Sequence, residues 1–314
     1  MKKQISNYFK NLEKLSDNKY NNMLIADGET VEIIDDHRYN VAGVPVFAKT
    51  DSPENILFGV ASAEMYNDNG IIAPKTAPVL IPSISKSSSI ILPTSRIGIL
   101  SQDVKGLKEQ GFEVATGTQI KNFWEICNHD IHDEPTTNKW FILYNKNFRK
   151  KFLNIMTEDC FDDFTTLLLA DEFRTDTDRC WRNLFFYKSK NADKYEGIIT
   201  IDLENEQFLH LDLKPNKDPF DAFLKSSYKT YTFDNSRDSF QPYSERLKNI
   251  KNLLRDGVLT PEQKSTFKNI LNYGLAEKIK QKGEKYDLQD YAYRPYEFFS
   301  KIEEYSKDVF GNYL

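Results

Sequence analysis

The fold prediction rests on Asp176-Thr-Asp-Arg-Cys-Trp-Arg-Asn183, followed by Gly197-Ile-Ile-Thr-Ile-Asp202. This stretch places Asp178 five residues before Asn183, and puts Asp202 directly after an apolar run. Transfer of a phosphoryl group from ATP uses these three kinds of side chain. Asp178 would accept the proton of the acceptor hydroxyl, while Asn183 and Asp202 would bind Mg²⁺, a hard cation that prefers oxygen ligands. The alternative is a polar turn whose Asp and Asn side chains only satisfy backbone groups.

The segments around this motif are predicted to hold it in place. Residues 160–172 carry apolar side chains at the 3.6-residue period of a buried helix. Residues 184–187 and 197–201 are short apolar runs separated by a polar turn, which is typical of two strands of a hairpin. We therefore expect the motif on a loop between a buried helix and a hairpin, with Asp202 at the end of the second strand.

The N-terminal part of the chain supplies a second pair of charged residues. Val44-Pro-Val-Phe-Ala-Lys49 is a strand-like run that ends in a lysine, and Ser52-Pro53 then starts a helix with an N-cap serine. Glu64 falls on an apolar face of that helix, where a carboxylate needs a partner. Lys49 is the expected partner, because a strand lysine paired with a helix glutamate positions ATP phosphates in kinases. The alternatives are an exposed lysine and a solvated glutamate.

The order of these elements resembles the HipA-type bacterial kinases and, more distantly, the phosphatidylinositol 3- and 4-kinases. Thr177-Asp178-Arg179 followed by Asn183 is similar to their catalytic loop, which contains an Asp-Arg pair. The helix that carries Glu64 resembles their glutamate helix, and residues 97–104 resemble the strand and hinge that hold adenine. The resemblance covers roughly residues 24–210. It implies that backbone groups near three residues bind the adenine edge: Ser101, Gln102 and Asp103.

The resemblance implies an α+β, two-lobed protein-kinase-like fold. Residues 1–104 would form a small β-rich N-lobe, and residues 105–314 would form a larger, mainly helical C-lobe. The implied activity is transfer of the ATP γ-phosphate to a hydroxyl of a protein serine or threonine, with Mg²⁺ as cofactor. Lys49 and Glu64 would join Asp178 as catalytic residues. The family includes growth-arresting toxins, so an antitoxin or regulator is an expected partner, and self-labelling is an expected reaction.

Departures from the kinase pattern leave other functions open. Ala26-Asp-Gly-Glu29 has a single glycine, so no Gly-rich phosphate loop is evident, and the metal motif reads Asp202-Leu-Glu204 instead of Asp-Phe-Gly. A pseudokinase that acts as an interaction module is therefore a second hypothesis, and a phosphoinositide kinase is a third. A separate cluster, Cys127-Asn-His129-Asp-Ile-His132, offers zinc ligands. Structural zinc sites usually draw ligands from two clusters, which favours an acidic surface loop here.

The C-terminal part of the chain is charged and is predicted to be helical. Residues 243–255 have leucine and isoleucine side chains at helical spacing. Thr260-Pro-Glu-Gln263 combines an N-cap, a first-turn proline and a capping-box glutamine. We expect the helix that starts there to carry both Phe267 and Leu275 on its buried side.

Composition limits the partners and the location. The 314 residues provide enough material for a large core, and a net charge of −5 argues against a general nucleic-acid binder. The sequence has no apolar run of 18 residues, so no membrane span is expected. The three cysteines form no close pair, which is typical of reduced thiols. We therefore expect a cytoplasmic protein, with a secreted effector as the alternative.

Overall fold

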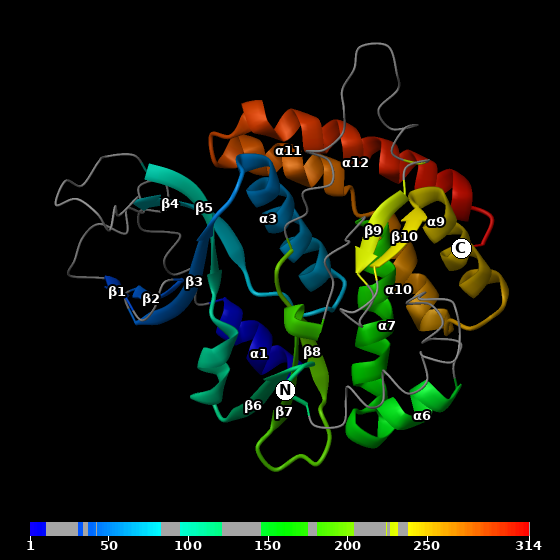
Figure 1. The fold of residues 1–314 in the computed structure, drawn as a ribbon, viewed down its shortest axis with the longest axis horizontal. Coiled ribbons are helices and arrows are strands. Elements are labelled where there is room, and N and C mark those ends of the chain that lie inside the picture. Colours follow the sequence, from blue (N-terminus) through cyan, green and yellow to red (C-terminus); the bar gives the residue numbers. More distant parts are fainter. Residues whose placement is uncertain are drawn as a thin grey trace.

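The protein is described by a computed structural model that covers residues 1–10, 31–33, 37–41, 43–82, 95–120, 146–174, 181–203, 224, 227–231 and 238–313. Helices and antiparallel sheets are mixed along the chain. Figure 1 shows a five-stranded sheet at one end of the molecule and helices at the other. None of the described helices is both long and apolar enough to cross a membrane.

The five-stranded sheet has the order β1-β2-β3-β5-β4, and all neighbouring strands are antiparallel. Its strands are β1 (Val31–Ile33), β2 (Arg38–Val41), β3 (Val44–Thr50), β4 (Thr76–Pro82) and β5 (Ser95–Gln102). Side chains alternate between the two faces of β3. Val46 and Ala48 are buried in a cluster with Leu100, whereas Phe47 and Lys49 are half-buried on the other face. The alternation aims Lys49 away from the core of the sheet.

Helix α3 (Pro53–Asp68) follows β3, and its predicted start is confirmed. The Ser52 side chain accepts a hydrogen bond from the N–H of Asn55 at 3.2 Å, and Pro53 occupies the first turn. After the helix, Gly70 takes a left-handed conformation with φ +80°, which is common for glycine at the end of a helix. Eleven of the 16 residues of α3 are buried, and Val60 packs against Ile99 of β5. The helix therefore lies inside the molecule and not on its surface.

A second sheet, of three antiparallel strands, carries the predicted hairpin. Its strands are β6 (Phe112–Thr116), β7 (Leu184–Ser189) and β8 (Gly197–Thr200). The short helix η2 (Val104–Lys108) links β5 to β6. Helix α1 (Lys2–Phe9) buries Ile5, Tyr8 and Phe9 in a cluster with residues of η2, β6, β7 and β8. The first helix is therefore part of the core beneath this sheet.

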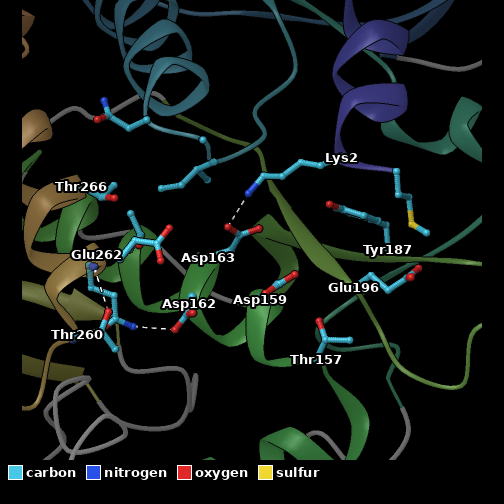
Figure 2. A pocket seen from close by; sticks show the side chains of 16 residues that line it. Lys2, Thr157, Asp159, Asp162, Asp163, Tyr187, Glu196, Thr260, Glu262 and Thr266 are labelled. Carbon is cyan, nitrogen blue, oxygen red and sulfur yellow. Dashed lines mark hydrogen bonds and ion pairs between the residues drawn. The ribbon is translucent and has the colours of Figure 1, made fainter.

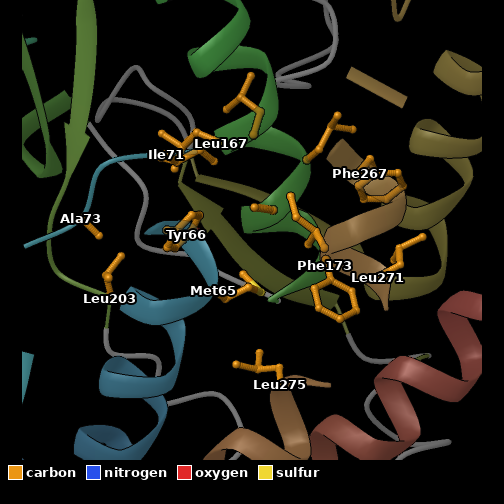
Figure 3. Packing of buried hydrophobic residues seen from close by; sticks show 14 of the residues in the cluster. Met65, Tyr66, Ile71, Ala73, Leu167, Phe173, Leu203, Phe267, Leu271 and Leu275 are labelled. Atoms are coloured by element: carbon orange, nitrogen blue, oxygen red, sulfur yellow. The ribbon is translucent and has the colours of Figure 1, made fainter. Parts of the chain in front are cut away.

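The predicted helix over residues 160–172 is confirmed as α7 (Glu158–Phe173), which follows α6 (Lys146–Ile155). A two-stranded sheet, β9 (Ser227–Tyr231) and β10 (Asp238–Pro242), leads into α9 (Tyr243–Arg255). The remaining helices are α10 (Pro261–Leu271), α11 (Leu275–Lys285) and α12 (Gln289–Phe310). Figure 3 shows Met65 and Tyr66 of α3 packed among residues of α7, α10 and α11 in one hydrophobic core.

The C-terminal helices confirm one prediction and correct another. The Thr260 hydroxyl and the Gln263 side chain form the complete capping box at the start of α10. The prediction that Leu275 belongs to the same helix is wrong, because α10 ends at Leu271 and Leu275 begins α11. Gly274 lies between the two helices with φ +75°. A residue with positive φ cannot continue a right-handed helix, so the chain turns there.

Candidate active site

A pocket of about 300 Å³ lies where the five-stranded sheet meets the end of the hairpin. Phe47 and Lys49 of β3 and Ile99 of β5 line one part of it. Phe185 of β7 and Ile201, just after β8, line another part. The pocket therefore combines an apolar section, rich in aromatic and branched side chains, with a charged section.

The charged section contains two of the predicted site residues, Lys49 and Asp202, and a third, Asn183, lies beside them. The ammonium of Lys49 forms an ion pair with the carboxylate of Asp202. The Asn183 side-chain amide donates a hydrogen bond of 3.1 Å to the other oxygen of the same carboxylate. These side chains come from positions 49, 183 and 202, which are distant in sequence, so their meeting follows from the fold.

Local structure fixes the two residues of the hairpin. Asn183 ends the short helix η3 (Trp181–Asn183), and its carbonyl accepts a hydrogen bond of 3.1 Å from the N–H of Ile201. Asp202 has φ +58°, in the left-handed region that residues other than glycine seldom occupy. Aspartate is among the few residues that tolerate this region. The chain therefore turns sharply at Asp202, directly beside Asn183.

A buried arginine supports this turn from behind. Arg174, at the C-terminal end of α7, is fully buried, and its guanidinium donates a hydrogen bond to the carbonyl of Leu203. It also donates to Ser62 Oγ at 3.0 Å and to the Tyr66 hydroxyl at 2.7 Å, both on α3. Asp171 lies 3.7 Å away as its counter-charge. One side chain thus links α7 and α3 to the residue that follows Asp202.

The backbone pairing of β5 limits which of the predicted adenine-binding residues can bind a ligand through their backbone groups. At Asp103 the N–H donates to the carbonyl of Pro45 at 3.0 Å, and the carbonyl accepts from the Tyr8 hydroxyl at 2.8 Å. Both backbone groups of Asp103 are therefore already engaged. Burial raises the pKa of Tyr8 to about 12, so its hydroxyl remains a donor at neutral pH.

Gln102 has a different backbone orientation. Successive residues of an antiparallel strand point their N–H and C=O groups to opposite sides. Because Asp103 points toward β3, the backbone groups of Gln102 point toward β4. Strand β4 begins only at Thr76, opposite Ser101, so the paired part of β4 ends before Gln102. Of the three predicted hinge residues, Gln102 is best placed to present backbone groups to a ligand.

Glu64 has a partner other than the predicted one. Its carboxylate forms an ion pair with Lys282 of α11, a residue 218 positions away, instead of with Lys49. The physical reason is that α11 packs along α3 and brings Lys282, whose side chain is only 12% exposed, against Glu64. Lys49 meanwhile reaches Asp202. In place of the expected ion pair between Lys49 and Glu64, the structure has one between Lys49 and Asp202 and another between Glu64 and Lys282.

Three predictions fall on parts of the chain that are not described. Asp178 lies outside the described residues, as do Glu204 and the cluster from Cys127 to His132. The role of Asp178 therefore stays a prediction.

Among the cysteines, Cys160 is buried, and burial raises the pKa of its thiol.

Sequence reasoning missed Arg174 and Phe185. The signal for Phe185 was present, since it is an aromatic residue in the strand that directly follows the predicted catalytic loop. The signal for Arg174 was weaker. Its position three residues after Asp171 at the end of an apolar helix indicates a local ion pair, but not its reach to Leu203.

No protein-family model and no curated protein matches the sequence. Several solved structures are similar, and two of them are described here. The chain shares 14% identity with a Helicobacter pylori proinflammatory kinase, CtkA, with a TM-score of 0.49 over 90% of this chain and 92% of that one. It shares 11% identity with the Shewanella oneidensis HipA, HipB and operator DNA complex, with a TM-score of 0.44 over 97% of this chain and 71% of that one.

The donor set fits a hard divalent cation. Asp202 provides a carboxylate, and Asn183 places an amide within 3.1 Å of it. Carboxylate and amide oxygens are suitable ligands for Mg²⁺, which keeps several of its waters and binds protein through only one or two carboxylates. The Lys49 ammonium already neutralises this carboxylate in the structure, which indicates that positive charge is favourable there.

Proposed function

We propose that this protein is an ATP-dependent kinase that transfers the γ-phosphate to a hydroxyl group of a protein serine or threonine. The observation that carries the proposal is the cluster of Lys49, Asn183 and Asp202, in which Lys49 and Asp202 line the pocket and Asn183 bonds to Asp202. A phosphate-binding cation, a metal-binding pair and a binding surface for a base would thus lie together at one pocket. The proposed architecture is an N-lobe of residues 1–104 and a C-lobe of residues 105–314.

The pocket suggests how the nucleotide lies. The adenine would stack between Phe47 on one sheet and Phe185 with Ile201 on the other, because a planar base buries most apolar area between flat side chains. Its polar edge would meet the backbone groups of Gln102. The phosphates would then extend toward Lys49, whose ammonium would bind them in place of Asp202.

Each residue has a separate task in the transfer. Asp178 would accept the proton of the acceptor hydroxyl while the hydroxyl oxygen bonds to the γ-phosphorus. The bond between the γ-phosphorus and the bridging oxygen would break at the same time, and ADP would leave. Lys49 would hold the phosphates in line for this displacement. Asn183 and Asp202 would hold Mg²⁺, which neutralises charge on the phosphate oxygens. Arg174 would keep Asp202 in position through Leu203.

We propose a protein acceptor because the chain, with a net charge of −5, lacks the overall positive charge that favours anionic lipid surfaces. An antitoxin or regulatory protein as partner and a cytoplasmic location belong to the same proposal.

One observation favours a second function. In kinases the strand lysine pairs with the helix glutamate, and here Glu64 is held by Lys282. A pseudokinase that binds nucleotide without transferring phosphate would tolerate this arrangement. Such a protein would serve as an interaction module whose shape depends on the nucleotide.

The test uses γ-labelled ATP and Mg²⁺ with the wild-type protein and two variants. Asp202→Asn keeps a residue that tolerates the left-handed turn, and Asp193→Asn is the matched control on the exposed turn of the same hairpin. We expect self-labelling or ATP consumption that falls by at least about 100-fold in Asp202→Asn and is unchanged in the control. Asp178→Ala should show the same loss.

The outcomes separate the two functions. Transfer at wild-type rate in Asp202→Asn would contradict the proposed roles. Binding of ATP that depends on Mg²⁺, without turnover when protein acceptors are supplied, would favour the pseudokinase.

A further inference from the structure

A second and larger pocket, of about 550 Å³, lies on another part of the molecule. It is formed by the start of α1, the first turns of α7 and α10, and the hairpin of β7 and β8, as Figure 2 shows. It shares no lining residue with the pocket that contains Lys49. Its volume lies within the range of about 300–1,000 Å³ that is usual for sites that bind small molecules.

The lining of this pocket is strongly acidic. Five carboxylates line it, and Lys2 is the one basic side chain among its lining residues. The carboxylates belong to Asp159, Asp162, Asp163, Glu196 and Glu262. With all of these side chains ionised, they carry a net charge of −4.

Part of this charge has a structural explanation. Asp159 and Glu262 lie in the first turns of α7 and α10, where carboxylates are stabilised by the helix dipole. Asp162 accepts a hydrogen bond of 2.9 Å from Gln263. Asp163 is different, because it lies beyond the first turn and its side chain is only 15% exposed. A largely buried carboxylate is stabilised in its ionised form by a nearby cation, so positive charge in the pocket is favourable.

The protein itself shows how the pocket receives a cation. The ammonium of Lys2 reaches in from the rim and binds Asp163 at 2.7 Å, while the lysine side chain remains 45% exposed. The pocket thus accommodates a single ammonium on an alkyl chain. This ammonium neutralises one carboxylate and leaves most of the pocket's negative charge in place.

A polar group that the protein does not use faces the same space. Tyr187 is 99% buried, yet within the described part of the chain its hydroxyl forms no hydrogen bond. In Figure 2 the hydroxyl end of Tyr187 points toward Asp163 and Lys2. The hydroxyl oxygen is not fully enclosed by protein atoms, so it stays accessible from the pocket although the rest of the side chain is buried. A donor supplied by a ligand in the pocket would satisfy it.

We infer that this pocket binds a flexible cation with several ammonium groups on an alkyl chain, supplied by a free polyamine or by a lysine-rich peptide segment. One ammonium would displace Lys2 from Asp163 and donate to the Tyr187 hydroxyl, and a second would reach the first-turn carboxylates. The aliphatic chain would lie against Ile71 and the tyrosine ring. The inference does not depend on the proposed kinase activity.

Calorimetric titration of the full chain with spermidine at about 0.15 M salt tests the site. A short trilysine peptide and Mg²⁺ are titrated in parallel. We expect saturable binding of one equivalent of spermidine, weakened about tenfold by Asp163→Asn and also weakened by Tyr187→Phe, which removes only the hydroxyl. Asp308→Asn, an exposed carboxylate on α12, is the control that should leave the affinity unchanged.

Lys2→Met gives the sharpest readout, because it removes the internal competitor. The affinity for spermidine should then rise several-fold, whereas non-specific attraction to an acidic protein would change only slightly. Tighter binding of the peptide than of spermidine would assign the ammonium groups to a protein partner, and the reverse would assign them to a free polyamine. Equal affinity in Asp163→Asn and Asp308→Asn, or binding of Mg²⁺ as tight as that of spermidine, would overturn the inference. Absence of saturable binding in both wild type and Lys2→Met would show that the pocket only docks α1.

Discussion

Replacement of Arg174 by methionine should destabilise the protein more than almost any other single substitution. Methionine keeps much of the length and apolar contact of the arginine side chain but removes its charge and its donors. The change strips partners from Ser62 Oγ, the Tyr66 hydroxyl and the Leu203 carbonyl, and it leaves Asp171 as a fully buried carboxylate without its counter-charge. Breaking a buried ion pair on one side costs about 3–5 kcal/mol. Domains have a total stability of about 5–15 kcal/mol, so the loss should be large.

Urea unfolding followed by circular dichroism measures this loss. The control is Arg149→Met, because Arg149 also pairs with a carboxylate, Glu158 at 2.9 Å, but both side chains are more than half exposed. The control should change the unfolding free energy by less than about 1 kcal/mol. Addition of Asp171→Asn to Arg174→Met should recover part of the loss, since the buried charge is then removed. An unfolding free energy of Arg174→Met within 1 kcal/mol of the wild type would refute the reasoning.

Three further results are expected. Lys49→Met should lower phosphate transfer by at least about 100-fold in the labelled-ATP assay while the urea midpoint stays close to that of the wild type. Burial raises the pKa of Asp163 to about 6, so the folded state holds its proton over the range in which the unfolded state has lost it. The unfolding free energy should therefore fall as pH rises from about 4 to about 6, by up to about 3 kcal/mol, and Lys2→Met should extend this fall to higher pH. Gly283→Ala should destabilise by about 1–3 kcal/mol although alanine favours helices, because the new methyl group would lie 2.7 Å from Cβ of Ala292.

Each of these results has a control. Asp163→Asn should remove the part of the pH dependence that is assigned to Asp163, and a pH profile that is identical in wild type and variant would contradict the assignment. Lys49→Arg separates charge from geometry, since it keeps the positive charge on a larger head group. Combining Gly283→Ala with Ala292→Gly should restore stability if the close approach of α11 and α12 is the cause.

Local signals made much of the fold predictable. The caps at Ser52 and Thr260 involve side chains that bond to backbone groups three residues away, so the sequence alone contains both partners. The 3.6-residue spacing of apolar residues in α7 and the short apolar runs of β7 and β8 were also signals contained in short stretches of sequence. Gly274 was a local signal as well, but it lay within a continuous apolar period and was not taken as a break.

Partners across the fold were not predictable in this way. Glu64 was expected to meet Lys49 because both belong to neighbouring elements in sequence, but the packing of α11 on α3 brings Lys282 closer. Lys282 lies 218 positions from Glu64, so no local sequence pattern predicts this contact. Arg174 reaches partners on α3 and beyond β8 at once, so its role exists only when the helices and the hairpin are packed.

The packing of α1 has a consequence for the two pockets. One end of this helix places Lys2 on Asp163, and the other end places the Tyr8 hydroxyl on the carbonyl of Asp103. Eight residues at 1.5 Å per residue make a rod of about 12 Å, which lines the acidic pocket through Lys2 and contacts Asp103 in the wall of the other pocket through Tyr8. A ligand that displaces Lys2 therefore acts on the same helix that holds Asp103 of the proposed nucleotide site. Thermodynamic reciprocity then requires that any change it causes in nucleotide affinity be matched by an equal change in its own affinity when nucleotide binds.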